Sequence, residues 1–253
     1  MNSIMPYISY FGTATLLKIF SMNSLTKKAY RIISNKYFQS NHYNVSDIDF
    51  SRGLWLYKSI NQTIPKQNNQ RYQLLEIGTG WTHFYGLFLR HLMNIDLTLF
   101  DIRDNRQWDA TKTRAKNLYS KLSELGPAAG IPTESLKYSK FIADCISNSG
   151  NFVQLYTNLK IKYFIESDGN LQNLDDQKFD VIFSVDVFEH IDSFALDQTI
   201  SQIYGLLKPG GISIHQIGID DHLTHYAKNM GAKEYLRYSD RTWKLFFENN
   251  NIK

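Results

Sequence analysis

The chain of 253 residues has a single cysteine, Cys145, which excludes an internal disulfide framework and a cysteine-based metal site. A reducing compartment is the simplest setting for such a chain, so we expect a cytoplasmic protein. The net charge is only +4, far from the dense basic stripe that nucleic-acid binding requires. Nucleic acid is therefore not expected as a partner.

The sequence also lacks a long uninterrupted apolar run. Its most apolar stretch, residues 4–20, is interrupted by Gly12, Lys18 and several hydroxyl side chains, and no basic residue precedes it. We expect neither a membrane span nor a signal peptide there. Basic residues follow the apolar turns, so two interpretations stay open for residues 4–36: an amphipathic helix packed on the domain, or peripheral contact with an anionic membrane.

What the sequence does contain is an alternation of strand-like and helix-like segments, which begins after a polar stretch at residues 66–71. It predicts an α/β fold with a doubly wound, mostly parallel sheet in residues 73–253, preceded by a helical N-terminal cap in residues 1–72. The connection at about 105–160 is too long for a simple crossover, and its periodicity predicts a helical insertion after the second strand. The strands are predicted at 74–77, 97–100, 162–165, the first half of 179–190, and 212–217.

The first predicted strand runs into Gly78-Thr79-Gly80. Two glycines one residue apart let the backbone approach a ligand and present amide N–H groups to it, although such a pair more often makes an ordinary turn. The second strand ends in Asp101, 23 residues after Gly78. In a parallel sheet an acid at that place can accept hydrogen bonds from both hydroxyls of a ribose.

Four segments in this order resemble a class I S-adenosylmethionine-dependent methyltransferase: residues 76–80, Asp101, residues 179–191 and residues 206–211. The resemblance covers about residues 73–217. It implies S-adenosylmethionine as the cofactor and, with a cap and an insertion that could close a pocket, a small-molecule, glycan or lipid-linked acceptor. A nicotinamide dehydrogenase shares the glycine turn, but His83 occupies the place of the third fingerprint glycine, and Leu-Lys-Pro-Gly-Gly before strand five is typical of methyltransferases.

The resemblance also implies roles for single residues. Glu76 would hold the loop near the methionine ammonium group, Asp101 would bind the ribose, and Asp168 would meet the adenine amino group. Trp81 and Thr82 depart from relatives that have a third glycine two residues after Gly80. The residues implied in cofactor binding are Glu76, Gly78, Thr79, Gly80, Asp101, Asp168, Ser184 and Asp186.

A hydroxyl acceptor would need a general base, and the candidates at the ends of strands four and five are His190, His215 and Asp186. No metal site is expected, because Asp220, Asp221, His222 and His225 match no standard ligand spacing, so they predict a solvated substrate-entry loop.

This class of fold normally adds a helix and two antiparallel strands after strand five. Only one further helix, at about 240–249, is predicted here, which leaves two interpretations: the C-terminal strands are missing from a truncated or partial sequence, or the fold has an unusual ending. The alternative to an enzyme is a non-catalytic, cofactor-binding or scaffold protein that keeps the methyltransferase fold.

Overall fold

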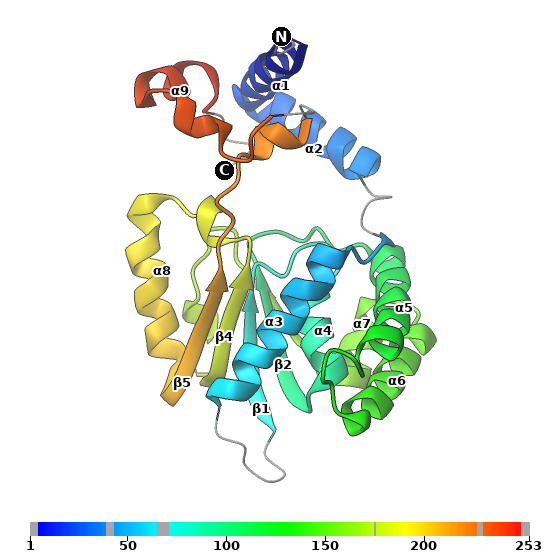
Figure 1. Ribbon diagram of the computed structural model, residues 1–253. Coiled ribbons are helices and arrows are strands. Elements are labelled where there is room, and N and C mark those ends of the chain that lie inside the picture. Colours follow the sequence, from blue (N-terminus) through cyan, green and yellow to red (C-terminus); the bar gives the residue numbers. More distant parts are fainter. Residues whose placement is uncertain (1–4, 39–42, 65–70, 175, 227–229, 249–253) are drawn as a thin grey trace. The chain divides into compact units, whose positions relative to one another are not determined.

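A computed structural model describes residues 5–38, 43–64, 71–174, 176–226 and 230–248 (Figure 1). The chain divides into two compact units, which we treat separately. The larger unit comprises Gln39–Phe188 and Asp192–Gln216, and the smaller unit comprises Met1–Phe38, Glu189–Ile191 and Ile217–Lys253. Compactness alone does not decide which segments fold independently, so the boundary at residue 72 stays a prediction.

The larger unit contains a five-stranded sheet in the order β3-β2-β1-β4-β5, with every neighbouring pair parallel. This confirms the predicted doubly wound α/β fold. All strands run the same way, so their carboxyl ends lie along one edge of the sheet, where ligands bind in such folds (Figure 1). The strands are β1 (Tyr72–Ile77), β2 (Ile95–Asp101), β3 (Lys162–Ile165), β4 (Phe179–Val185) and β5 (Leu207–Gln216).

Helices cover both faces of the sheet because successive strand residues point to opposite sides. Leu74 faces one core with the helices that flank β1 and β2, whereas Leu75 faces a second core with Ile203 and Leu206. Three helices occupy the predicted insertion after β2. The helices of the larger unit are α3 (Asp47–Thr63), α4 (Phe84–Leu92), α5 (Trp108–Leu125), α6 (Thr133–Asn148), α7 (Phe152–Leu159) and α8 (Ser193–Leu206).

Strand β5 begins five residues earlier than the predicted 212–217, because Lys208-Pro209-Gly210-Gly211 is an irregularity inside the strand. Phe179 pairs with Leu207 and Val181 pairs with Ile212, so four residues of β5 lie opposite Asp180 alone. Lys208 closes the irregularity with an ion pair to Asp180 at 2.8 Å. This motif therefore lies at the amino end of the sheet, away from the ligand-binding edge. Its role is to shift the pairing of β4 with β5.

The smaller unit joins the two ends of the sequence. Helix α1 (Met5–Ser21) packs Tyr10, Ala14 and Leu17 against Leu223 and Phe247. Tyr10 donates a hydrogen bond to Asp221 at 2.5 Å. The other elements are α2 (Ser24–Phe38), α9 (Asp240–Phe246) and the short 3-10 turns η3 (Phe188–His190, shared with the larger unit), η4 (His222–Tyr226) and η5 (Glu234–Arg237).

Apolar side chains also lie on the outside of α1 and α2, among them Leu16, Leu25 and Ile32, which are 58%, 78% and 61% exposed. No helix within the described ranges is both long enough and apolar enough to cross a membrane. Peripheral membrane contact by residues 4–36 stays a prediction, and residue 4 and several side chains at the end of α2 lie outside the described part. Between Gln216 and residue 248, the described segments contain no further strand.

Candidate functional site

The glycine turn after β1 has a left-handed backbone. Gly78 and Gly80 have φ angles of +71° and +63°, which side-chain-bearing residues adopt at a cost. A Cβ atom on Gly78 would lie 2.4 Å from Cγ2 of Val187, whereas one on Gly80 would meet no described atom within 4 Å. Gly78 is therefore required by packing, and Gly80 presents bare backbone to open space.

Asp101, at the end of β2, holds this turn from the neighbouring strand. Its Oδ2 accepts a hydrogen bond from the Gly80 N–H at 2.8 Å, and its Oδ1 accepts one from the Arg103 N–H at 3.2 Å. Burial raises the pKa of Asp101, and these N–H groups partly oppose the increase. A carboxylate has about four acceptor positions, so acceptor capacity remains for a hydroxyl of a ligand.

A chain of buried hydrogen bonds leads from the turn into the helical insertion. The Thr79 hydroxyl donates to Oε2 of Glu76 at 3.0 Å and lies 2.8 Å from Nδ1 of His83. Nε2 of His83 lies 2.7 Å from the Tyr156 hydroxyl on α7. Glu76, Thr79 and His83 are all buried. The glycine turn is thus tied to a helix more than seventy residues further along the chain.

The tautomer of His83 is coupled to the direction of the Thr79–Glu76 hydrogen bond. Burial lowers the pKa of His83 to about 3, so the ring is neutral and carries one N–H. With the Thr79 hydroxyl donating to Glu76, Nδ1 of His83 donates to Thr79 and Nε2 accepts from the Tyr156 hydroxyl.

The carboxyl group of Glu76 is the inner end of this chain. Burial raises its pKa to about 8, although the bonds from Thr79 and from the Gly86 N–H favour the ionised form. The Gly86 N–H on α4 donates to Oε2 at 3.1 Å. A Cβ atom on Gly86 would lie 2.5 Å from that oxygen, so glycine inside the helix allows the carboxyl group to approach.

Arg106 covers the outer end of the hydrogen-bond chain. Its Nη1 donates to the Tyr156 hydroxyl at 3.3 Å, and its guanidinium carbon lies 4.6 Å from the centre of the Tyr163 ring. The His83 ring also packs edge to face against Phe152 at 5.3 Å. The sequence analysis used His83 only to exclude a dinucleotide fingerprint and gave no role to Tyr156 or Arg106. The departure at Trp81 and Thr82 was the only signal that this loop is built differently.

At the carboxyl ends of β4 and β5, Ser184 and His215 pair, with Oγ and Nδ1 2.8 Å apart. Burial lowers the pKa of His215 to about 4, and its ring lies 4.1 Å from that of Phe188, measured between centres. Asp186 forms an ion pair of 2.6 Å with Arg52 on α3, a residue that the sequence analysis did not identify. Oδ1 of Asp186 is buried and has no hydrogen-bond partner among the described residues.

The remaining two predicted site residues are Asp168 and His190. Asp168 is exposed after β3, and its Oδ1 accepts a hydrogen bond from the Asn170 N–H at 2.9 Å. His190 belongs to the smaller unit. The structure therefore gathers the glycine turn, Glu76, Asp101, Ser184 and Asp186 at or near the carboxyl edge of one sheet, and the roles implied for all of these residues stay predictions.

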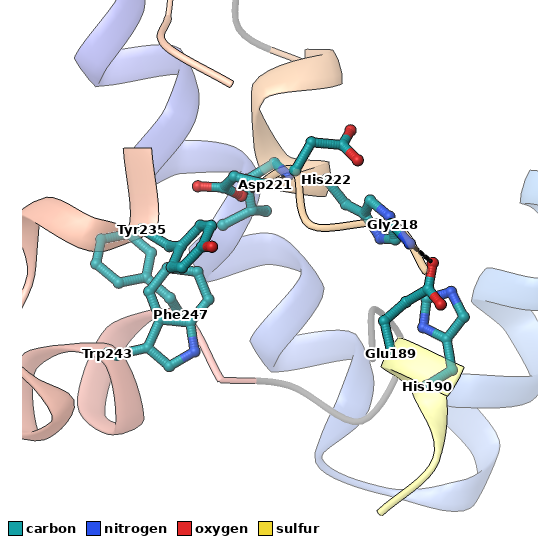
Figure 2. A pocket seen from close by; sticks show the side chains of 10 residues that line it. Glu189, His190, Gly218, Asp221, His222, Tyr235, Trp243 and Phe247 are labelled. Atoms are coloured by element: carbon teal, nitrogen blue, oxygen red, sulfur yellow. Dashed lines mark hydrogen bonds between the residues drawn. The ribbon is translucent and has the colours of Figure 1, made fainter. Parts of the chain in front are cut away.

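His190 lines a pocket of about 200 Å³ within the smaller unit (Figure 2). Its ring centre lies 5.3 Å from that of His222. Asp221, which the sequence analysis placed in a solvated loop, is only 4% exposed. No metal-binding group of His, Cys, Asp and Glu is found within the described ranges, and the His225 side chain lies outside them. The pocket is lined by Glu189, His190, Gly218, Asp220, Asp221, His222, Leu223, Tyr235, Trp243 and Phe247.

Residues 54–251 match the methyltransferase-domain family, and this match spans most of the chain. The parallel α/β sheet, the glycine turn and the acid at the end of β2 agree with this match. The chain belongs to the methyltransferase-domain family. The match confirms the predicted resemblance to class I methyltransferases, whose methyl donor is S-adenosylmethionine.

Solved structures give distant similarities. The CurJ carbon methyltransferase is 17% identical, with 81% of this chain and 45% of that chain covered and a TM-score of 0.42. An O-methyltransferase family protein from Burkholderia thailandensis is 11% identical, with 78% and 44% covered and a TM-score of 0.37. A DhpI–SAM–HEP complex is 13% identical, with 85% and 71% covered and a TM-score of 0.38. The chain spans less than half the length of the first of these proteins, and no curated protein matches it.

The residues at the sheet edge fit an adenosine-type ligand. Gly80 leaves space where a side chain would stand, and Asp101 beside it retains acceptor positions for hydroxyl groups. Oδ1 of Asp186 is a buried acceptor without a partner among the described residues, which a ligand donor would satisfy. Together these features favour a ligand with vicinal hydroxyls and a hydrogen-bond donor.

Proposed function

We propose that this protein transfers the methyl group of S-adenosylmethionine to a small-molecule, glycan or lipid-linked acceptor. When bound, the cofactor supplies a methyl group on a positively charged sulfur, which a nucleophilic atom of the acceptor can take. The chain itself has to bind the cofactor, orient the acceptor and accept a proton where the acceptor is a hydroxyl.

One observation carries this proposal: Oδ2 of Asp101 lies 2.8 Å from the amide of Gly80, whose outer side is bare. The Gly80–Asp101 hydrogen bond fixes the position of the carboxylate relative to the glycine turn before any ligand binds. A preformed surface loses little conformational entropy on binding, so it supports binding of the cofactor's ribose.

The three candidate bases have different surroundings. Asp186 is ion-paired with Arg52, and His215 is bonded through Nδ1 to Ser184 and packs at a tilt against Phe188. His190 is an exposed residue at the lining of a pocket. We propose that one of these three groups accepts the hydroxyl proton, because a general base must reach the acceptor.

Calorimetric titration with S-adenosylmethionine and S-adenosylhomocysteine tests the proposal. Asp101→Ala should raise both dissociation constants by about 100-fold, since a hydrogen bond to a charged group contributes roughly 1.5–3 kcal/mol. Asp96→Ala is the matched control, because Asp96 lies at the amino end of the same strand and pairs with Arg71. The control should bind both ligands as the parent does.

No binding by the parent protein, or equal binding by the parent and Asp101→Ala, would overturn the cofactor assignment. Transfer of radiolabelled methyl groups into fractions of a cell extract then distinguishes an enzyme from a binding protein. Binding without transfer into any fraction would favour the non-catalytic, cofactor-binding alternative.

A further inference from the structure

The pocket of the smaller unit has two chemically different walls (Figure 2). Tyr235 and Trp243 lie on one side with Phe247, and Glu189, His190 and His222 lie on the other. Flat aromatic faces bury apolar surface, whereas carboxylates and imidazoles exchange hydrogen bonds. The pocket therefore suits a ligand with one apolar face and a polar edge.

The size of the pocket limits the ligand further. The pocket has a volume of about 200 Å³, which accommodates one small ring. A ring of monosaccharide size is therefore compatible with it.

Charge disfavours an anionic ligand in this pocket. The lining residues include three acids and neither lysine nor arginine, so a phosphate or carboxylate would be repelled. The acids are largely used by the fold: Asp221 accepts from the Tyr10 hydroxyl and the Leu223 N–H, and Oε1 of Glu189 accepts from the Gly218 N–H at 2.9 Å. These two acids therefore already accept hydrogen bonds from the protein before any ligand arrives.

A neutral ring with several hydroxyl groups meets all three requirements. Each hydroxyl both donates and accepts hydrogen bonds, as an imidazole group can, and the C–H face of the ring can pack on Trp243. We propose that this pocket binds a sugar ring.

The chain carries its own reporters for the test, because its four tryptophans include Trp81 beside the glycine turn and Trp243 in the pocket. Protein labelled with 5-fluorotryptophan gives one fluorine NMR resonance for each, assigned with single Trp→Phe variants. Glucose, galactose, mannose and rhamnose are titrated separately, with spermidine as a cationic probe and S-adenosylmethionine as the cofactor probe.

We expect at least one sugar to shift the Trp243 resonance saturably, with a dissociation constant on the order of 1 mM, and to leave the Trp81 resonance unchanged. His222→Phe keeps an aromatic ring but loses the hydrogen bonds, and should weaken sugar binding about tenfold. Asp197→Asn, on the exposed surface of α8, is the control for an unrelated polar substitution and should leave sugar binding unchanged. An unaltered unfolding midpoint for His222→Phe shows that the effect is local.

The proposal is overturned if no sugar shifts the Trp243 resonance, if spermidine does so in place of the sugars, or if the sugars move all four resonances alike. S-adenosylmethionine provides the separate test of the cofactor site through Trp81. A sugar response without a cofactor response would leave the sugar pocket standing and refute the proposed methyltransferase activity. The opposite result would refute only the sugar pocket.

Discussion

The glycine turn of the larger unit and the pocket of the smaller unit differ in how deeply their polar side chains are buried. In the turn, Glu76, Thr79 and His83 are at most 5% exposed and hydrogen-bonded to one another. In the pocket, His190 and Asp220 are exposed and line a surface that solvent can reach. The turn is therefore part of the folded core, whereas the pocket is a partly exposed surface at the edge of a core.

This difference has a consequence for mutation. A buried polar group that loses its partner costs about 1–3 kcal/mol of folding free energy, so variants of the turn should lower stability and ligand binding together. An exposed lining residue can change with little effect on folding, so variants of the pocket should alter binding alone. Three pairs of variants sharpen or break this comparison.

The largest effect is expected at the glycine turn itself. Gly78→Ala combines a left-handed backbone with a Cβ atom 2.4 Å from Val187, so we expect a loss of about 2–4 kcal/mol in unfolding free energy. Gly80→Ala has the same backbone cost without the clash, so it should lose about 1–2 kcal/mol while its Cβ occupies the ligand side. Denaturation in urea measures both, and equal losses would show that Val187 does not restrict the turn.

A smaller effect is expected at the link to the insertion. Tyr156→Phe leaves Nε2 of His83 buried without its donor, which should lower the unfolding free energy by about 1–3 kcal/mol and weaken S-adenosylmethionine binding several-fold. Tyr204→Phe removes a hydroxyl from a side chain that is 81% exposed and should change neither quantity. Unchanged cofactor affinity in Tyr156→Phe would show that the turn does not depend on the insertion.

These variants also separate what the sequence could predict from what it could not. The strands, the glycine turn and Asp101 follow from local periodicity and from spacing along neighbouring strands, both of which depend on short stretches of chain. The link between His83 and Tyr156 joins residues 73 positions apart. Nothing in either local pattern specifies that contact, because it depends on how the insertion packs.

The pocket was missed for the same reason. Tyr10 of α1 and Asp221 are 211 positions apart, yet their hydrogen bond helps to assemble the unit that holds the pocket. The sequence analysis assigned the two ends of the chain to different domains and therefore interpreted residues 220–225 as a solvated loop. Aromatic residues such as Trp243 and Phe247 carried no local signal of a binding wall, since aromatics at helical spacing usually pack in a core.

The last comparison concerns the pH dependence of the unfolding free energy, from which the contribution of Glu76 can be separated. The folded pKa of Glu76 is about 8 and its ordinary value is 4.5, so the folded state holds the proton more tightly than the unfolded state. The stabilisation from protonated Glu76 is therefore complete below about pH 4.5 and is lost as the pH rises through about 8. His83, with its pKa lowered to about 3, acts in the opposite sense, since its stabilisation is lost as the pH falls below its ordinary value of 6.5.

Glu76→Gln removes the first effect and keeps the second. Its unfolding free energy should fall less between pH 6.5 and pH 8 than that of the parent, by up to about 1.4 kcal/mol per pH unit for one proton. Urea denaturation at a series of pH values measures the difference, with Glu134→Gln as the control at an exposed carboxyl group on α6. Parallel pH profiles for the parent and Glu76→Gln would mean that Glu76 is ionised in the folded turn. The turn would then resemble the solvated pocket more closely than its burial indicates.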